Sequence, residues 1–470
     1  MSDTAQNTDK TKDFVEDDAQ DSSLYGLNDE IVSDVARALR EEDTSSVKEV
    51  IQDLSSADQA DLIEKLADSE RTQLLDTART DIQPQTYSEL ESDVANSLLT
   101  EMKASNVASI VSQLDSDDRL SLLEDLDPVF QKDIIQKLST HNQIALEEGL
   151  SFPKDSAGRL MSREFVAIPE FWSVGKTIDY LRETSEKMPE NFSDIFLIDP
   201  FYHISGEVPL HMILRSPREA KIKDLALEDI HTIPSDADQE DVAYLFKRED
   251  ISSAPVVDAD SRLIGVVTVD DVIDVIEEEA REDILRLGGV EKDDIYRAVF
   301  DTTRARFKWL FVNLITAVLA SIVIGFFEAT IEQIVALAIL MPIVASMGGN
   351  AGTQTLTIAV RALATKDLSK SNAWRIMVKE TLVGLTNGLL FAIIVGLVTY
   401  LWFGSDLLAL VISMAMAFNL IIAGIFGISI PIILDRFNID PALASSVFLT
   451  TVTDVVGFFV FLTLAGIILL

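Results

Sequence analysis

A single carboxylate, Asp454, lies near the middle of the last long apolar run of the chain, residues 442–470. Placing a charged carboxylate at the centre of a bilayer costs at least about 2.5–3.5 kcal/mol, so we expect it to face a wet interior instead of lipid. Hydroxyl oxygens lie close by on Thr450, Thr451 and Thr453. Together these oxygens predict a lined path for a cation. The alternative is a protonated or hydrogen-bonded Asp454 that only fixes helix packing.

A second unusual segment, PIVASMGGNAGTQTLTIAVRAL at residues 342–363, combines glycines with neutral oxygen acceptors inside an apolar run. Glycine-rich backbone at membrane depth is tolerated where it is buried in protein or lines a water-filled cavity. Tight helix packing through small residues is one reading, and the presence of Asp454 favours a pore. The residues concerned are Gly348, Gly349 and Gly352, with Asn350, Thr353 and Gln354.

The elements that must position these residues are apolar runs in the second half of the chain. Each is long enough to supply the ~20 residues that span a ~30 Å hydrocarbon core. The runs cover roughly 309–327, 333–359, 377–403, 407–434 and 442–470. We therefore predict a membrane domain of five helices over residues 306–470.

Bases in the loops predict the orientation of these spans. They precede the first run and separate the second from the third, at Arg304, Arg306, Lys308, Arg361, Lys366, Lys370, Arg375 and Lys379. In the loops after the first and third runs the charged residues are all acidic, namely Glu328, Glu332 and Asp406. By the positive-inside rule the N-terminal domains are cytoplasmic. Five spans then place the C-terminus outside, as in a multi-pass protein of the plasma membrane.

The formal charge of −39 lies entirely before residue 306, because residues 306–470 hold eight Lys and Arg and eight Asp and Glu. So acidic a chain is not expected to bind nucleic acid, whose phosphates need basic partners. It favours either a very soluble surface or the binding of cations. The absence of cysteine excludes disulfides and thiolate metal sites. Residues 1–24 form an acidic tail that does not resemble a signal peptide and is expected to be disordered.

Residues 25–150 are predicted to form a small helical solenoid. The segments VKEVIQDLSSADQADLIEKL (47–66) and VASIVSQLDSDDRLSLLEDL (107–126) align at an offset of 60 residues. Ser and Asp stand where each short amphipathic helix would begin. The leucines that fall in register are Leu54 with Leu114, Leu62 with Leu122, and Leu66 with Leu126.

A βαββα pattern occurs twice over residues 151–220 and 221–280, and it resembles a tandem pair of cystathionine β-synthase (CBS) domains. Matching residues are Ile168-Pro169 with Ile233-Pro234, Asp199 with Asp258, and Gly206 with Gly265. Members of that family bind adenine nucleotide through Gly-x-x-[Ser/Thr]-x-x-Asp. The resemblance therefore implies an ATP site at Gly265, Thr268 and Asp271. The first copy has Pro209 and Met212 at the corresponding places.

An enzyme is not expected. The sequence VGKT at 174–177 lacks the earlier glycine of a phosphate-binding loop, since Glu170 stands there. The four histidines are scattered without ligand spacing, and we find no nucleophile-base arrangement.

The order of solenoid, CBS pair, connecting helix at residues 281–305 and five spans resembles the MgtE family of magnesium channels. The motifs that carry the resemblance are GGNAGTQ with RALAT, then DPALASS and TTVTDVVGF. The resemblance implies a homodimer in the lipid bilayer, a pore between its two membrane halves, and Asp454 as the ion-selecting carboxylate. The expected pore lining is Gly348, Gly349, Asn350, Gln354, Ser446 and Thr450. Ser446 and Val447 depart from the residues usual in the family.

The same resemblance implies regulatory Mg2+ sites in the cytosolic domains. In the segment VDDVIDVIEEEAREDI (269–284) and in two shorter stretches, acids fall where the family binds metal. They are Asp271, Asp274, Glu279, Glu282 and Asp283, then Asp238 and Glu240, and in the solenoid Asp117 and Asp118. Ser121 replaces a frequent Asp beside the last pair.

We therefore expect a Mg2+-selective channel that closes when cytosolic Mg2+ binds these acids and that ATP modulates. Facing carboxylates repel one another, and Mg2+ between them converts repulsion into attraction. Gly288-Gly289 is expected to break the helix that transmits the signal. The rival hypotheses are transport of another cation such as Co2+ or Mn2+, and a membrane-anchored Mg2+ or nucleotide sensor without a pore.

Overall fold

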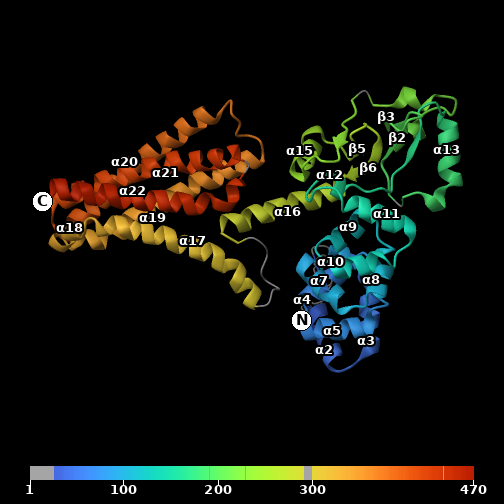
Figure 1. Ribbon diagram of the computed structural model, residues 1–470, viewed down its shortest axis with the longest axis horizontal. Coiled ribbons are helices and arrows are strands. Elements are labelled where there is room, and N and C mark those ends of the chain that lie inside the picture. Colours follow the sequence, from blue (N-terminus) through green and yellow to red (C-terminus); the bar gives the residue numbers. More distant parts are fainter. Residues whose placement is uncertain (1–25, 190, 228, 291–298, 438) are drawn as a thin grey trace, which may run out of the picture. The chain divides into compact units, whose positions relative to one another are not determined.

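A computed structural model describes residues 26–189, 191–227, 229–290, 299–437 and 439–470 (Figure 1). The expected acidic tail, residues 1–24, and the part of the expected connecting helix at 291–298 lie outside the described residues. The chain forms two compact units, Met1–Ile276 and Glu277–Leu470. Each unit has its own fold.

The first part of the N-terminal unit consists of short helices. Ser, Asp or Asn side chains cap the N-termini of several of them. Ser55 accepts a hydrogen bond from the backbone N–H of Asp58 at 3.2 Å, and Ser139 accepts one from Asn142 at 3.3 Å. The register leucines lie in one continuous core, where Leu62 and Leu114 are fully buried. The helices are α2 (Asp29–Arg40), α3 (Thr44–Asp53), α4 (Ser56–Lys65), α5 (Asp68–Ala78), α6 (Thr86–Glu89), α7 (Ser92–Glu101), α8 (Ala104–Val111), α9 (Ser116–Glu124), α10 (Pro128–Ile135), α11 (Thr140–Gly149) and α12 (Ala157–Leu160).

Two three-stranded sheets of the same topology follow. The first contains β1 (Ala167–Pro169), β2 (Asp194–Ile198) and β3 (Ile204–Pro209), and the second contains β4 (Ile233–Pro234), β5 (Ser253–Val257) and β6 (Leu263–Thr268). In each sheet the first strand pairs parallel to the second, and the second pairs antiparallel to the third. The βαββα repeat predicted from the sequence is thus present in both copies.

Helices complete each copy. The first copy has α13 (Val174–Glu183), the 3-10 turn η2 (Ser185–Lys187), α14 (Leu210–Arg215) and the turn η3 (Ile222–Leu225), and the second has α15 (Gln239–Glu249) and α16 (Val269–Leu287). Apolar side chains of both sheets, Phe196, Leu263 and Val266, form a small shared core. The helix α16 ends directly before Gly288, and Gly289 has a positive φ of 74°. The glycine pair therefore ends the helix as expected.

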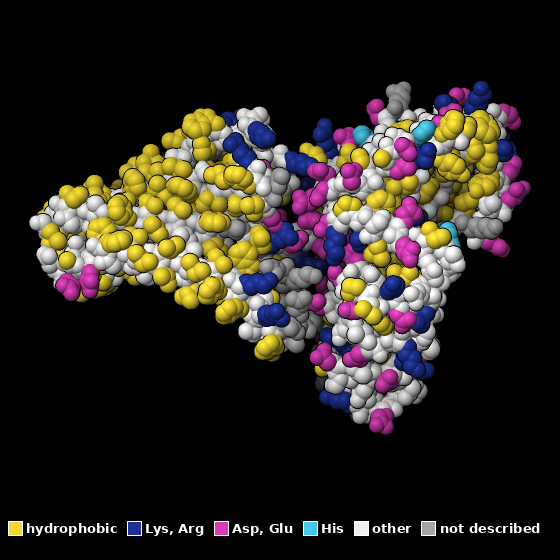
Figure 2. Space-filling model, viewed as in Figure 1, with side chains coloured by type: hydrophobic (Ala, Val, Ile, Leu, Met, Phe, Trp, Pro, Cys, Tyr) yellow, Lys and Arg dark blue, Asp and Glu magenta, His cyan; other side chains and the backbone are white. Residues whose placement is uncertain are grey.

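The C-terminal unit is a bundle of long helices. They are α17 (Val299–Gly325), the short α18 (Glu328–Gln333), α19 (Ala336–Ala364), α20 (Ala373–Phe403), α21 (Asp406–Arg436) and α22 (Pro441–Ile468). Among the described residues, five helices are long and apolar enough to cross a membrane. Hydrophobic side chains cover most of the visible face of this bundle in Figure 2.

Small residues allow the helices to approach closely. A Cβ atom at Gly384 would lie 2.6 Å from the carbonyl oxygen of Leu420, and one at Gly424 would lie 2.7 Å from the carbonyl oxygen of Glu380. Glycine is therefore required where α20 meets α21. The helix α21 packs against α19, α20 and α22, and it occupies the centre of the bundle (Figure 1).

The glycine-rich segment does not break its helix. The helix α19 runs continuously through Gly348, Gly349 and Gly352, with Pro342 in its interior. Glycines in such a segment could bend the helix or let a neighbouring helix come close. In α19 they let neighbouring helices come close. Gly348 lies against Asn419 of α21 and Gly352 lies against Leu449 of α22, so both glycines serve close packing.

Candidate functional site

Asp454 lies in the middle of α22 and is partly exposed. Among the described residues, we find no hydrogen-bond donor and no base in contact with its carboxylate. Ser446 and Thr450 precede it by two turns and one turn and are also partly exposed. A spacing of four residues places these three side chains on one face of α22. The carboxylate is therefore not locked against neighbours of its own chain.

The neighbouring helix α19 has two different faces. Its small and apolar residues, among them Gly352 and Leu356, are buried against the bundle. The polar side chains of Asn350, Thr353 and Gln354 are exposed. The helix thus presents an uncovered polar face within a segment long and apolar enough to cross a membrane.

The two adjacent glycines of this helix lie on different sides. A Cβ atom at Gly349 would meet nothing within 4 Å, so this glycine faces open space beside Asn350. Gly348 is buried, and a Cβ atom there would overlap the side-chain amide of Asn419 on α21. Among the residues predicted to line a pore, Gly348 therefore supports the packing of α19.

The sequence reading treated Asp454 as the exceptional acid of the spans and overlooked Glu380. This residue lies within α20, is only 5% exposed, and accepts a hydrogen bond of 3.5 Å from the hydroxyl of Thr355. Lys379 lies 3.3 Å from the other carboxylate oxygen. Glu380 was missed because it follows a run of loop bases, so it looks like part of the loop. The buried Asn419 was also missed, since a lone Asn gives no periodic signal.

A first acidic cluster joins the helical domain to the second CBS copy within the N-terminal unit. It contains Asp117 and Asp118 from the first turn of α9 and Asp271 from the first turn of α16. Burial and the carboxylates of Asp271 and Asp118 raise the pKa of Asp117 to about 8. Burial and Asp115 raise the pKa of Asp118 to about 6. Burial also raises the pKa of Asp271.

These shifts have one physical cause, because carboxylates that lose water beside other carboxylates resist ionisation. One carboxylate oxygen of Asp117, Oδ1, is buried and has no hydrogen-bond partner. A hard cation with oxygen ligands would supply the missing positive charge, so these residues fit Mg2+. Among the described residues, no three acidic or histidine side chains converge closely enough to hold an ion as they stand.

The remaining predicted acids of this unit lie at the start of α15 and one turn further along α16. Asp238 caps the N-terminus of α15 and accepts a hydrogen bond of 2.9 Å from the backbone N–H of Glu240, and both side chains are exposed. Asp274 faces Glu89 of α6, whose pKa is raised by burial and by that neighbouring charge. Glu89 is thus an additional acid that the sequence reading did not select.

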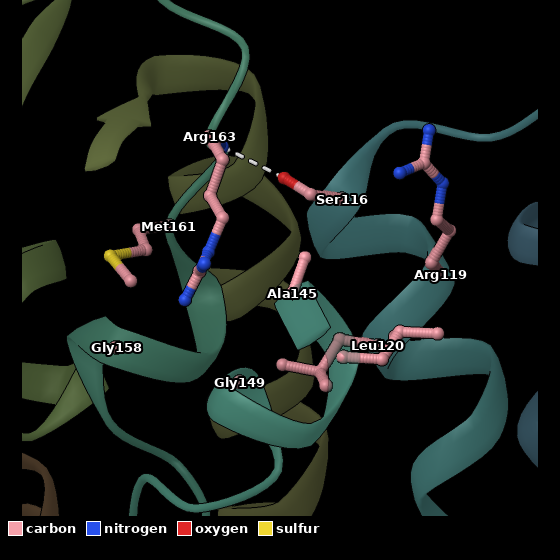
Figure 3. Close-up of a pocket in the computed structure, with 9 residues that line it drawn as sticks. Ser116, Arg119, Leu120, Ala145, Gly149, Gly158, Met161 and Arg163 are labelled. Carbon is pink, nitrogen blue, oxygen red and sulfur yellow. Dashed lines mark hydrogen bonds between the residues drawn. The ribbon is translucent and has the colours of Figure 1, made fainter. Parts of the chain in front are cut away.

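Hydrogen bonds hold α9 in place beside the first cluster. The hydroxyl of Ser116 donates to Glu164 at 2.6 Å. It also accepts a hydrogen bond of 2.8 Å from the backbone N–H of Arg163 (Figure 3). A cavity of about 10 Å3 lies behind this contact, between α9, α11 and α12. Because Ser116 directly precedes Asp117, the contact fixes the turn that carries the acids.

A second acidic cluster lies within the C-terminal unit, where the end of α16 meets the start of α22. Burial, Asp440 and Glu279 raise the pKa of Asp283 to about 6. Arg286 contacts both Glu282 and Asp440, so positive charge already compensates part of this cluster. Asp440 also caps α22 by accepting a hydrogen bond of 2.7 Å from Ala442. The sequence reading quoted Asp440 in DPALASS without selecting it as a ligand.

The predicted nucleotide motif lies at the junction of β6 and α16. A Cβ atom at Gly265 would lie 2.5 Å from the sulfur of Met161, so close packing requires the glycine. The hydroxyl of Thr268 donates to Asp271 at 2.7 Å. The carboxylate that a nucleotide would need therefore also belongs to the first acidic cluster.

These features define a membrane protein with five spans, a polar face in the membrane and two acidic clusters outside it. Residues 341–464 match the family described as MgtE, divalent cation transporter. Residues 54–155 match the MgtE intracellular N domain, and residues 222–278 match the CBS domain. The magnesium transporter MgtE of Thermus thermophilus is 32% identical over 345 residues, which cover 73% of this chain and 76% of the relative. The chain belongs to the MgtE family.

Two further similarities were found. The magnesium transporter MgtE of Bacillus subtilis is 32% identical over 321 residues, covering 67% of this chain and 70% of the relative. The crystal structure of the cytosolic domain of the Mg2+ channel MgtE in complex with ATP is 26% identical, with a TM-score of 0.48, and covers 52% of this chain and 99% of that chain. The expected architecture of helical domain, CBS pair and five membrane helices is confirmed.

The raised pKa values predict that a rise in pH lowers the stability of the metal-free protein and increases the stabilisation by Mg2+. Without metal, the folded state holds the protons of Asp117 and Asp118 more tightly than the unfolded state, so stability is lost as pH rises from about 4 through about 8. Mg2+ needs the ionised carboxylates, so its stabilisation should be larger at pH 8 than at pH 6. Thermal unfolding of the full chain in detergent, with and without Mg2+, measures both effects.

Two variants sharpen this test. Asp117→Asn should raise the metal-free melting temperature at pH 8 by a few degrees, since about 1 kcal/mol shifts a domain of this size by about 2–4 °C. It should also reduce the shift that Mg2+ causes. Asp76→Asn removes an equal charge from an exposed position and should leave both effects as in the wild type. An equal Mg2+ shift at pH 6 and pH 8 would contradict the assignment.

Proposed function

We propose that the chain is a magnesium channel that acts as a homodimer in the plasma membrane, with its cytosolic domains N-terminal and its C-terminus outside. The relatives from Thermus thermophilus and Bacillus subtilis bear the name magnesium transporter. The observation that carries the proposal is the carboxylate of Asp454, which has no partner among the described residues. It shares a helix face with Ser446 and Thr450, and its helix α22 packs against α19, the helix with the uncovered polar face.

A second copy explains why α19 leaves polar side chains uncovered. Asn350 and Gln354 would be costly against hydrocarbon, since polar groups in lipid need hydrogen-bond partners. Two copies that face each other across a two-fold axis would enclose these groups around water. Each copy would then contribute one Asp454 to the same passage. The passage would be lined by Gly349, Asn350, Gln354, Ser446 and Thr450, with Gly348 behind it.

The proposed path contains few charged side chains, which suits an ion that retains its hydration shell. Mg2+ prefers six oxygen ligands at about 2.0–2.1 Å and releases water reluctantly. Hydroxyl and amide oxygens with one carboxylate from each copy can bind a hydrated ion through its water molecules. A dense ring of acids would hold the ion too tightly for release.

Gating would use the two acidic clusters. The helix α16 carries Asp271 near its start and Asp283 near its end, so it takes part in both clusters. Mg2+ bound between the carboxylates would remove their repulsion and favour the form in which they lie close together. At its end α16 contacts the cap of α22, the helix that carries Asp454.

Several sites are needed for such a switch. Moving a two-state equilibrium from 1:99 to 99:1 requires about 5.5 kcal/mol of differential binding. A single weak Mg2+ site supplies only part of this energy. The proposed sites use Asp117, Asp118, Asp271, Asp274, Glu279, Glu282 and Asp283, with Asp238 and Glu240 as further acids.

ATP would bind at Gly265, Thr268 and Asp271 and modulate the response to Mg2+. The support for this step is the Gly-x-x-Thr-x-x-Asp pattern at the start of α16. Because Asp271 also belongs to the first acidic cluster, a nucleotide and a metal ion would act on the same carboxylate. Binding of ATP would therefore change the response of the first acidic cluster to Mg2+.

Asp454→Asn keeps the shape of the side chain and removes its charge. We expect it to reduce Mg2+ flux into liposomes by more than about tenfold, because a loss of ~1.4 kcal/mol in ion stabilisation corresponds to a factor of ten. Asp406→Asn, at the exposed first residue of α21, serves as the matched control and should conduct as the wild type does. Undiminished flux through Asp454→Asn would place the ion site elsewhere.

Neutralising the first cluster should weaken closure by cytosolic Mg2+. In the double variant Asp117→Asn, Asp271→Asn, the Mg2+ concentration that halves the flux should rise by about tenfold or more, the factor that ~1.4 kcal/mol of binding represents. Patch recordings with Mg2+ varied on the cytosolic side measure this concentration. The double variant Asp53→Asn, Asp76→Asn, which removes two charges at exposed positions, controls for net charge. Closure at an unchanged concentration would exclude the cluster from gating.

Isothermal titration of the purified protein with ATP tests the nucleotide step. Heat of binding is expected for the wild type, and Thr268→Val should weaken it because the hydroxyl that orients Asp271 is lost. The melting temperature measured without ligand provides the control that Thr268→Val remains folded. An absence of heat for the wild type would remove ATP from the mechanism.

A further inference from the structure

Asn419 is the most deeply buried amide of the membrane bundle, with 0% of its surface exposed near the middle of α21. Its Nδ2 donates a hydrogen bond of 2.9 Å to the carbonyl oxygen of Val344 on α19. Its Oδ1 is buried and has no hydrogen-bond partner among the described residues. An unpaired buried polar atom destabilises the fold, so packing alone does not explain this residue.

Two glycines from different helices make room for this side chain. A Cβ atom at Gly348 on α19 would overlap the amide nitrogen of Asn419. A Cβ atom at Gly457 on α22 would lie 2.9 Å from the same nitrogen and 3.2 Å from Oδ1. One amide thus fills the space that both glycines leave open, and it fixes how closely the two helices approach α21.

The same two helices carry the residues of the proposed ion path. Gly348 precedes Asn350 by two residues, and Gly457 follows Asp454 by three. At a rise of about 1.5 Å per residue, each polar side chain lies within about 5 Å of the contact along its helix axis. A change in the size of the side chain at 419 therefore acts on the spacing of α19 and α22 at the level of Asp454.

We propose that Asn419 is a positioning residue that sets the separation of Asn350 and Asp454 and thereby the selectivity of the path for hydrated divalent ions. This inference rests on the proposed channel function. The hydrogen bond to Val344 holds α19, and the contact with Gly457 holds α22. A hydrated ion that is bound through its water molecules is sensitive to this distance, because the oxygen atoms of both helices must reach the same shell.

The test compares Mg2+ and K+ flux through purified full-length variants in liposomes. Asn419→Ala should lower the ratio of Mg2+ to K+ flux by about tenfold, the factor that ~1.4 kcal/mol in ion stabilisation represents. Asn419→Leu keeps the branched shape of the side chain with a larger volume and loses the hydrogen bond, so it should lower the same ratio. A wild-type ratio in Asn419→Leu would show that the amide is not required and would overturn the proposal.

A size-complementary pair separates positioning from a general loss of packing. Gly348→Ala alone should impair Mg2+ flux severely, because its methyl group overlaps the amide of Asn419. The double variant Gly348→Ala, Asn419→Ala replaces the lost volume and should recover a higher Mg2+ to K+ ratio than either single variant. Gly325→Ala, where a Cβ atom meets nothing within 4 Å, is the matched control.

The outcomes are distinct. A wild-type protein that conducts no Mg2+ would overturn the proposed channel function and this inference with it. A wild-type protein that conducts Mg2+, together with single variants of unchanged ratio or a double variant that recovers nothing, would overturn only the role of Asn419. Size-exclusion profiles and melting temperatures measured for every variant show whether a loss of flux comes from a loss of folding.

Discussion

The free energy of holding carboxylates with too little counter-charge governs every candidate site in this protein. Asp454 has no partner within the described residues of its chain, Asp117 has an orphaned oxygen, and Asp283 faces Asp440. A fixed Lys or Arg at these places would stabilise the fold at all times. Leaving the charge uncompensated makes the energy of each arrangement depend on the cations in solution, which is the condition for both passage and sensing.

The two acidic clusters differ in how much charge the protein itself supplies. Arg286 contacts Asp440 and Glu282 in the second cluster, whereas burial and mutual repulsion raise the pKa of Asp117 to about 8 in the first. The first cluster therefore gains more from an added cation and is coupled more strongly to protons. Because α16 takes part in both, the cation proposed at its first turn would also act on the turn that meets α22.

Periodic patterns made much of the fold predictable, since hydropathy over ~20 residues and repeated leucines depend only on nearby sequence. The spans, the paired CBS copies and the end of α16 at Gly288 follow from such patterns. Glu380 and Asn419 could not be found in this way, because their burial is decided by helices distant in sequence. The partners of Asp283, namely Asp440 and Arg286, depend on such a contact as well.

The polar composition of α19 follows from the two demands that its two faces meet. Gly348 and Gly352 let the helix lie against Asn419 and Leu449, so the bundle is held by close backbone contact. Asn350 and Gln354, on the uncovered side, remain available to water. A helix of Leu, Ile and Val would pack but offer no oxygen, and a helix polar on all sides would not pack in a bilayer. Dividing the residues between faces allows a rigid helix to line a wet path.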